Sequence, residues 1–558
     1  MAHVYGYDRC EPHRCGWGKG EIHVGGCHVS LSGLLARQTE THGDAVAIID
    51  VDRSWTYSEI STQCGRVSAA LCELGVVPGT LVGVHCNKGA DGFVAMHAVV
   101  SAGAVAVPLD PGSPPTRLAE ICRQMEIEVV ISHAPRAMSV AALHEQFPLR
   151  AVVGLQLKPG SRLEALCIDA EELAGFDPAP PQRVDIDAPS YIITTSGSTG
   201  QPKGIVHTHS SARAYAEMAL RNYGLTAQDR ISDIAPYHFD ISTLALWAVP
   251  LAGASNVVVN EPYQRLPASH SQLLQDQAVT IWYSVPFLLH QLVLRGDLEN
   301  RDLSAMRWVH FGGEVIAPET IAEMMRHCIN ARFANIFGPA ETNQCTLAIF
   351  DAPPPIDRPV SIGFPLDNTD IRVVDPDADT PELEHCVAAN VIGEMWTHST
   401  QLMEGYWGQQ ERNSQILKDV DGKRYYRSGD LVSVDESGEI AFHGRVDHQV
   451  KVRGFRIEIE GVELKLEKLG LAEHVVVGVL RAHSGLDELV AGVLGTTSNF
   501  DEEGFLRAAA SVLPSYAVPT HTVRIPALAF TASGKLDRRV LREHAVATAK
   551  GRNDELTS

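Results

Sequence analysis

Apolar and polar positions alternate in a regular way from about Ser30 onward. Short apolar runs are typical of buried strands: LVGVHC at 81–86, AVAVPL at 104–109 and VVISHA at 129–134. Segments of helical period lie among these runs, for example at 35–43 and 66–75. Strands that alternate with helices build strand-helix-strand units and a parallel sheet. The pattern up to about Pro178 therefore predicts an α/β fold.

The same alternation of strand-like and helix-like segments recurs in the middle of the chain. The apolar runs there are YIITT at 191–195, NVVVN at 256–260, TIWYSV at 280–285, RWVHFGGE at 307–314 and ARFANIFGPAE at 331–341. Several of them end in a loop that holds Gly, Pro or a carboxylate. Ligands of open α/β sheets gather beyond the carboxyl ends of the strands, so we expect a binding site at these loops.

The C-terminal third has a different pattern of apolar and polar residues. From about Ser361 the chain is rich in strand patterns, and LVSVDESGEIAFHG at 431–444 has the turn of a hairpin. After Asp447 a unit of ordinary small-domain size follows. We therefore expect an α/β protein with a large N-terminal domain of parallel sheets, which includes a small β-rich part, and a smaller, mobile α+β C-terminal domain. The expected boundaries are a flexible tail at 1–29, the large domain at 30–446, the small lid domain at 447–545 and a tail at 546–558.

Composition and charge restrict the kinds of partner and the cell compartment that we expect for the protein. The chain of 558 residues has a net charge of −22, which argues against nucleic acid or an anionic membrane as the main partner. It shows neither a signal peptide nor an apolar run long enough to span a bilayer, so we expect a cytoplasmic protein. Irregularly spaced cysteines at 64, 72, 86, 122 and 167 favour reduced core thiols over a disulfide framework. The Cys- and His-rich residues 1–28 match no metal-ligand spacing, which favours a flexible tail, or residues translated from upstream of the true start, over a zinc site.

The segment TTSGSTGQPKG at 194–204 is the first along the chain whose residues indicate a particular kind of binding site. It combines hydroxyls, glycines and Lys203 directly after an apolar run. Free backbone N–H groups, hydroxyls and a cation suit a polyphosphate. The spacing differs from the usual nucleotide P-loop, G-x-x-x-x-G-K-[ST]. A flexible Ser/Gly linker is the alternative, but a linker would not follow a buried strand and contain Pro-Lys-Gly.

This segment resembles the phosphate loop of the adenylate-forming superfamily, which includes acyl-CoA synthetases, luciferases and the adenylation domains of nonribosomal peptide synthetases. Further matching segments follow in order, and the resemblance covers about residues 30–540. They are WTYSEI at 55–60, AGAVAVPLDPGSPPTRL at 102–118, HFDIS at 238–242, NIFGPAET at 335–342, GEMWTHSTQLMEGYW at 393–407, YRSGDL at 426–431, GRVDHQVKVRGFRIEIEGVE at 444–463, LPSYAVP at 513–519 and SGKLDR at 533–538.

The resemblance implies that the enzyme joins a carboxylate to the α-phosphate of ATP and releases pyrophosphate, with Mg²⁺ as cofactor. It gives catalytic roles to Lys203, to Glu341 as the magnesium carboxylate, and to Lys535, which would bridge the two reacting anions. Asp430 would hold the ribose hydroxyls, a task suited to a two-oxygen acceptor, and Arg445 would lie near the nucleotide. The other implied ATP-binding residues are Thr195, Ser196, Gly197, Ser198, Thr199, Gly200, Asn335, Phe337, Gly338 and Thr342.

One departure from the family pattern falls at Ala340, where the family usually has Thr. The loss of that hydroxyl predicts slower adenylation, or compensation by Thr342. The resemblance also places a hinge at Asp447, about which the small domain rotates after adenylation. Gly454 would then let a phosphopantetheine arm approach, because glycine permits close contact; an ordinary turn is the alternative for this residue.

Asp240, in HFDIS, bears on the substrate. Members of the family that activate amino acids carry Asp here to pair with the substrate ammonium, and a charged carboxylate in a half-buried pocket needs an opposite cation. A helix-capping Asp is the alternative. Motif alignment lines the pocket with Asp240, Ile241, Leu244, Tyr283, His310, Gly312, Ile336, Gln344 and Cys345. Since only Asp240 is formally charged, we expect an amino acid with a small neutral or polar side chain, its amine α or β.

Only about 20 residues follow SGKLDR, too few for a carrier domain. We therefore expect a free-standing enzyme that passes its aminoacyl group to the phosphopantetheine of a separate carrier protein. Carrier proteins are typically acidic, and Lys451, Arg453 and Arg456 are candidates for a basic docking patch. An acid–CoA ligase is the alternative enzyme, and would tolerate loss of Asp240. A non-catalytic binding protein would lack Lys203, Glu341 or Lys535, yet all three are present.

Overall fold

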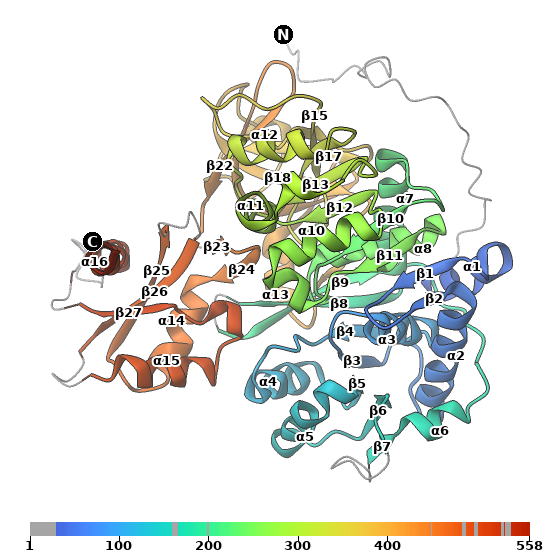
Figure 1. The fold of residues 1–558 in the computed structure, drawn as a ribbon. Coiled ribbons are helices and arrows are strands. Elements are labelled where there is room, and N and C mark those ends of the chain that lie inside the picture. The colour runs from blue at the N-terminus through green and yellow to red at the C-terminus, as the bar shows by residue number, and fades with distance from the viewer. Residues whose placement is uncertain are drawn as a thin grey trace.

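The computed structural model describes residues 30–158, 166–197, 200–447, 449–481, 487–495, 500–525, 529 and 537–557. Within these residues the chain forms two large mixed sheets, a smaller antiparallel sheet, and two short sheets near the C-terminus (Figure 1). The expected α/β class with a β-rich segment and a C-terminal α+β region is confirmed. Residues 1–28, with their Cys and His cluster, lie outside the described residues.

One large sheet has the strand order β19-β9-β8-β4-β3-β5-β6-β7, parallel from β8 to β7 and antiparallel at the β8, β9 and β19 edge. Its strands are β3 (Leu81–His85), β4 (Val105–Pro108), β5 (Val129–His133), β6 (Ala151–Leu155), β7 (Cys167–Ile168), β8 (Pro189–Ser196), β9 (Pro202–Thr208) and β19 (Gly405–Tyr406). Every residue of β3 is buried, as expected for a strand with both faces covered.

The other large sheet has the order β16-β15-β14-β13-β12-β10-β11-β1-β2, parallel from β14 to β1 and antiparallel at both edges. Its strands are β1 (Val46–Ile49), β2 (Ser54–Thr56), β10 (Arg230–Asp233), β11 (Ser255–Val258), β12 (Ile281–Ser284), β13 (Trp308–Gly312), β14 (Arg332–Phe337), β15 (Thr346–Phe350) and β16 (Phe364–Pro365).

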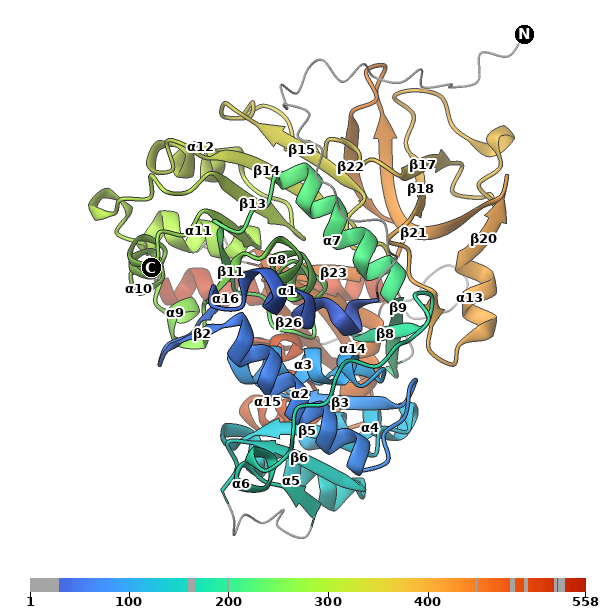
Figure 2. The ribbon, with the colours of Figure 1, turned by 90° about the vertical axis from the view of Figure 1, so that its right-hand side faces the viewer.

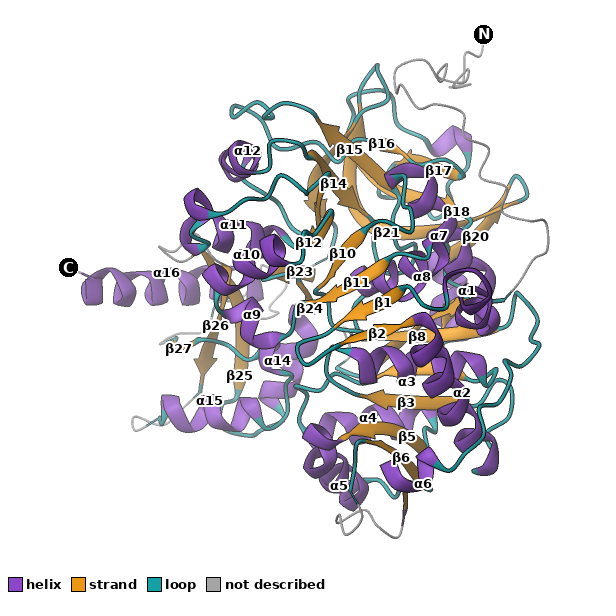
Figure 3. Ribbon diagram, turned by 45° about the vertical axis from the view of Figure 1, so that its right-hand side comes forward, coloured by secondary structure: helices purple, strands orange, loops and turns teal. Residues whose placement is uncertain are grey.

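Helices cover both faces of these sheets (Figure 3). The main core joins the two sheets through apolar side chains of α2, α3 and α7, while α4 and α5 pack on the outer face of one sheet and α10, α11 and α12 on that of the other. The helices of this part are α1 (Leu34–His42), α2 (Tyr57–Glu73), α3 (Ala90–Ser101), α4 (Pro115–Met125), α5 (Ala137–Gln146), α6 (Ala170–Ala174), α7 (His209–Tyr223), α8 (Val249–Ala252), α9 (Glu261–Arg265), α10 (Pro267–Asp276), α11 (Pro286–Arg295), α12 (Pro318–His327) and α13 (Gln410–Ile416).

The local sequence explains where α2 starts. Helix α2 begins with a capping box, in which Thr56 Oγ1 accepts from the Glu59 N–H at 3.2 Å and Glu59 Oε2 accepts from the Thr56 N–H at 2.8 Å. Each bond satisfies a backbone donor that the first turn leaves free. The WTYSEI segment therefore fixes the entry into α2.

The third sheet, seen at the upper right of Figure 2, is antiparallel and has the order β17-β18-β21-β20, with β22 paired to β21. Its strands are β17 (Thr369–Val374), β18 (Gly393–Ser399), β20 (Leu417–Val420), β21 (Lys423–Val434) and β22 (Ile440–Arg445). The β21–β22 pair is the hairpin expected at 431–444.

The C-terminal region, here residues 449–557, lies beside the larger body (Figure 1). The two-stranded hairpin β23–β24 points toward the larger body, and β25–β26–β27 packs against α14, α15 and α16. Its elements are β23 (Gln449–Val452), β24 (Phe455–Glu458), α14 (Ile459–Glu467), β25 (His474–Arg481), β26 (Asp487–Leu494), α15 (Glu502–Ala510), β27 (His521–Arg524) and α16 (Arg538–Thr557).

The described residues bear on two expectations from composition, which concern membrane-spanning helices and the burial of the cysteines. No helix in these ranges is both long and apolar enough to cross a membrane. Cys64, Cys86 and Cys122 are free and buried, as expected for core thiols, and Cys167 is free but only half-buried. Cys72 is free but exposed, so its placement in the core was wrong. Cys72 lies in the last turn of α2, on the face turned away from the core.

Candidate active site

The segment expected to bind phosphate is the connection between β8 and β9. Gly200 has a positive φ of 78°, and its N–H donates to Gly197 O at 2.9 Å. A Cβ added to Gly197 would lie 2.2 Å from Gln201 O, so only glycine fits there. Lys203 is the second residue of β9 and is almost fully buried, with its side chain 5 % exposed. The bare backbone and the lysine fit a polyphosphate; Ser198 and Thr199 lie outside the described residues.

A pocket opens beyond the carboxyl ends of β12, β13 and β14, as the α/β pattern predicted. Residues from β8, from the HFDIS segment, from the β14 end and from the hairpin β23–β24 face it. They include Thr194, Thr195, His238, Asp240, Ile241, Tyr283, Gly312, Ile336, Phe337, Gly338, Asp430, Arg445, Gln449, Lys451, Gly454, Arg456 and Tyr516. Phosphate-loop, acidic and hairpin residues, far apart in sequence, therefore share one space.

Glu341 is buried at the edge of this pocket. Its carboxylate accepts from Tyr406 Oη at 2.6 Å and from Arg456 Nη1 at 2.7 Å. Burial alone would raise the pKa of Glu341, but the bonds from Arg456 and Tyr406 outweigh it and lower the pKa to about 2. The side chain is therefore ionised, which suits a hard cation such as Mg²⁺.

Asp430 and Arg445 lie opposite each other on the paired strands β21 and β22. The Arg445 guanidinium donates to Asp430, and it also donates to Asp447 Oδ1 at 2.7 Å and to Ser428 O at 3.0 Å. Burial raises the pKa of Asp430, with Arg445 acting against that rise. The carboxylate in the pocket fits a pair of ribose hydroxyls, and Asp447 lies where the large body meets the C-terminal region.

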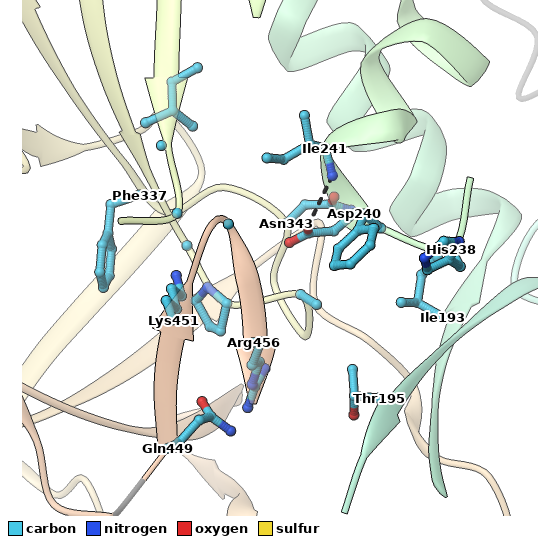
Figure 4. A pocket seen from close by; sticks show the side chains of 18 of the residues that line it. Ile193, Thr195, His238, Asp240, Ile241, Phe337, Asn343, Gln449, Lys451 and Arg456 are labelled. Carbon is cyan, nitrogen blue, oxygen red and sulfur yellow. Dashed lines mark hydrogen bonds between the residues drawn. The ribbon is translucent and has the colours of Figure 1, made fainter. Parts of the chain in front are cut away.

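Asp240 faces the same pocket, at the start of a short 3₁₀ turn (Asp240–Ser242) (Figure 4). Its Oδ1 accepts from the Ile241 N–H at 2.9 Å. Burial raises the pKa of Asp240, and the nearby Lys451 ammonium counteracts part of that rise. A buried carboxylate beside a cation and an open space can bind a substrate ammonium.

Only some of the residues that the sequence placed around the substrate side chain face the open space. Asp240, Ile241, Tyr283, Gly312 and Ile336 face the pocket. Leu244, His310, Gln344 and Cys345 lie buried in the wall behind them, and do not line the open space. Gln344 accepts from the Tyr223 hydroxyl, while Cys345 and the Thr342 hydroxyl are 2.9 Å apart.

Two residues expected at the nucleotide have other partners. Asn335 is buried and donates through Nδ2 to Ser361 O at 2.8 Å, and it does not line the pocket. The Thr342 hydroxyl donates to Pro339 O at 3.3 Å, so in this arrangement it does not replace the hydroxyl absent at Ala340. Lys535 lies outside the described residues.

Sequence reasoning missed the part that the hairpin plays in the pocket. Lys451 and Arg456 point into the pocket (Figure 4), where Lys451 lies near Asp240 and Asp430 and Arg456 binds Glu341. The expectation of a basic surface patch at these two residues is therefore wrong, because alternation along the strands turns them inward. Glu458 of β24 binds Lys203, with Oε1 and Nζ 3.1 Å apart.

Comparison with known proteins identifies the family of this chain. The family model of the AMP-binding enzymes matches residues 35–407, so the chain belongs to that family, and it is an adenylating ligase. It is 31% identical over 504 residues to phenyloxazoline synthase MbtB of Mycobacterium sp. (strain MCS), covering 89% of this chain and 40% of that protein. It is 30% identical over 533 residues to malpibaldin synthetase of Mortierella alpina, covering 92% and 9%. The chain thus spans less than half the length of these relatives.

Two solved structures share the fold. The amide bond synthetase McbA from Marinactinospora thermotolerans superposes with a TM-score of 0.80 at 21% identity, covering 92% of this chain and 99% of that one. NpsA-ThdA, an artificially fused adenylation-PCP di-domain NRPS from Klebsiella oxytoca, gives a TM-score of 0.73 at 21% identity, covering 89% and 93%. At this identity the likeness bears on the fold alone.

Proposed function

We propose that this enzyme activates an amino acid with a small neutral or polar side chain, its amine α or β, as an aminoacyl-AMP. It then transfers the aminoacyl group to the phosphopantetheine thiol of a separate carrier protein in natural-product biosynthesis. The observation that carries the proposal is the Asp240 carboxylate in a pocket shared with the phosphate-loop residues Thr194 and Thr195. An acid without an amine would leave that carboxylate without a substrate cation.

In the first half-reaction a carboxylate oxygen of the amino acid attacks the α-phosphorus of ATP, and pyrophosphate leaves with the electrons of the broken P–O bond. Asp240 holds the ammonium, and Tyr283, Gly312 and Ile336 shape the side-chain space, with Leu244, His310, Gln344 and Cys345 forming its outer wall. Asp430 orients the ribose. Lys203 and, by resemblance, Lys535 stabilise charge on the phosphates.

Glu341 is the residue that would hold Mg²⁺, which neutralises phosphate charge when it is bound. Its ionised carboxylate is chemically suited to this, although Arg456 occupies it in the arrangement described above. The 194–204 loop, with Gly197, Gly200 and the hydroxyls of Thr195, Ser196, Ser198 and Thr199, would cradle the phosphates, and Phe337, Gly338 and Arg445 would complete the nucleotide site. Asn335 and Thr342 would support that site from behind, through their bonds to Ser361 O and Pro339 O.

In the second half-reaction the thiol sulfur attacks the acyl carbon, AMP leaves, and the thiol proton passes to solvent. Gly454 at the hairpin turn lines the pocket, and its lack of a side chain would let the thiol approach. We propose that the chain divides at Asp447 into a large domain at 30–446 and a small domain at 447–545, and that this residue is the hinge between the half-reactions.

Amino-acid-dependent exchange of labelled pyrophosphate into ATP tests this function. The purified protein is assayed with α- and β-amino acids, aryl acids and short fatty acids. We expect one or a few neutral or polar amino acids to support exchange. Exchange with a carboxylic acid that lacks an amine, followed by acyl-CoA formation, would instead establish the alternative acid–CoA ligase.

A further inference from the structure

Asn343 is a pocket residue that was not among the site residues expected from the sequence. It lies in the loop between β14 and β15, and it lines the same open space as Asp240 (Figure 4). Only 8 % of Asn343 is exposed. Its backbone has a positive φ of 57°, a conformation that asparagine adopts more readily than most residues. The backbone therefore favours asparagine here, but it does not account for an amide buried at the proposed substrate site.

Two neighbours orient the Asn343 amide relative to Asp240. Thr243 Oγ1 lies 3.1 Å from Asn343 Oδ1 and 2.6 Å from Asp240 O, so the amide oxygen is held at the turn that carries Asp240. Asn343 Nδ2 donates to the Tyr191 hydroxyl at 3.4 Å. Burial raises the pKa of Tyr191, and the nearby Asp240 carboxylate adds to that rise. The amide of Asn343 and the carboxylate of Asp240 thus share the same neighbours at one end of the pocket.

The Asn343 amide oxygen has bonding capacity left over. A carboxamide oxygen has two lone pairs. In the part of the chain that the structure describes, the Thr243 hydroxyl is the one partner of Asn343 Oδ1. One lone pair of this oxygen is therefore open to a further donor in the pocket.

A substrate ammonium needs more acceptors than Asp240 offers. The ammonium carries three N–H groups, and Asp240 Oδ1 already accepts from the Ile241 N–H at 2.9 Å. An N–H group left without an acceptor in a buried pocket costs free energy. A second carboxylate would supply an acceptor, but its charge would oppose the ionisation of Asp240. A neutral carboxamide oxygen supplies the acceptor without that repulsion.

We propose that Asn343 is a substrate-binding residue whose Oδ1 accepts a hydrogen bond from the substrate ammonium, beside Asp240. Asp240 supplies the opposite charge and Asn343 supplies a second acceptor. Together the two residues select acids that carry an amine against acids that lack one. This inference rests on the proposed function, because it adds a second residue to the ammonium site proposed there.

Replacement of Asn343 by glycine tests this contact with little disturbance of the backbone. Asn343→Gly removes the amide, and glycine adopts the left-handed conformation without strain. Asn368→Gly is the matched control, because Asn368 also has a positive φ, of 63°, and is exposed outside the pocket. Circular dichroism and thermal unfolding establish that both variants are folded.

Calorimetry with nonreactive adenylate analogues provides the readout. The probes are L-alanyl-, β-alanyl- and propionyl-sulfamoyladenosine, and the propionyl compound differs from the other two only in lacking the amine. Wild type should bind at least one amine compound more tightly than the propionyl compound. Asn343→Gly should bind that amine compound about 10- to 150-fold more weakly, the loss expected for a hydrogen bond to a charged group, and the propionyl compound within about twofold of wild type. Asn368→Gly should bind all of the probes as wild type does.

Each result has a distinct meaning. A loss confined to the amine compound supports the contact between Asn343 and the ammonium. An equal loss for the propionyl compound would show that Asn343 only shapes the pocket through Thr243 and Tyr191, and it would overturn the proposal, as would unchanged binding of the amine compound by folded Asn343→Gly. If wild type binds neither amine compound more tightly than the propionyl compound, the ammonium site of the proposed function fails instead, so the two failures are distinguishable.

Discussion

Replacing Asp240 by asparagine is expected to remove amino-acid activation while leaving nucleotide binding intact. Asparagine keeps the size of the side chain, and its Oδ1 can still accept from the Ile241 N–H. Only the charge is lost. Breaking a desolvated ion pair by removing one partner costs ~3–5 kcal/mol. At about 1.36 kcal/mol per tenfold, kcat/KM for the amino acid should fall about 150- to 5,000-fold.

Pyrophosphate exchange measures this loss, with the KM for ATP determined in parallel. Asp276→Asn, at an exposed aspartate in α10, is the matched control and should behave as wild type. Because burial raises the pKa of Asp240, wild-type activity should decline on acidification at a higher pH than an ordinary aspartate would give, and Asp240→Asn should lack that decline. An unchanged kcat/KM for the amino acid would refute the ammonium contact, and an equal loss for ATP would indicate collapse of the whole pocket.

Two further variants test other parts of the account. Lys535→Ala should abolish adenylate formation while Mg·ATP still binds by calorimetry, and undiminished exchange would contradict the role given to Lys535. Asp229 is bound by Arg307 at 2.7 Å and 2.8 Å and by the Thr280 hydroxyl at 2.8 Å; burial opposes its ionisation, but these bonds keep its pKa below the ordinary value. Asp229→Asn should therefore lower the free energy of unfolding at pH 7 by about 2–3 kcal/mol in urea titrations, less than a fully buried pair because Arg307 is one-third exposed. The contribution of a carboxyl with a lowered pKa is present above its unfolded pKa and lost as pH falls through the folded value, so wild type should lose stability below about pH 4 and Asp229→Asn should lose less; parallel curves would contradict this reading.

The fold and the loop between β8 and β9 were largely predictable because their signals are local. Apolar runs such as LVGVHC are typical of strands covered on both faces. The glycines of the 194–204 segment indicate a loop in which there is no space for side chains at those positions. The pocket at the carboxyl ends of the strands follows from the topology of an open parallel sheet.

The depth of the pocket was not predictable from motif spacing. On β13 the residues Trp308, His310 and Gly312 lie on one face, and Gly312 lines the open space. His310 therefore lies one step further along the strand, in the buried wall. Sequence spacing places residues on a strand, but packing by other elements, here Tyr223 of α7 at 4.2 Å between ring centroids, decides which of them remain accessible.

The contacts of the hairpin were also missed, for a different reason. Lys203 and Glu458 are 255 positions apart and belong to different sheets, so no local pattern links them. Charge alone suggested that Lys451 and Arg456 face solvent. Their opposite charges are Asp240 in a 3₁₀ turn, Asp430 in β21 and Glu341 after β14, which only the folded chain brings together.

The most direct test of aminoacyl-AMP formation follows an oxygen atom. The amino acid that supports exchange is labelled with ¹⁸O in both carboxylate oxygens and incubated with ATP, Mg²⁺, enzyme and a phosphopantetheinylated carrier, and the AMP formed is analysed by mass spectrometry. Attack of the carboxylate on the α-phosphorus followed by transfer to the thiol leaves one ¹⁸O in each AMP, which is the result we predict. Unlabelled AMP would show that water, not the amino acid, attacks ATP, and would contradict the proposed function.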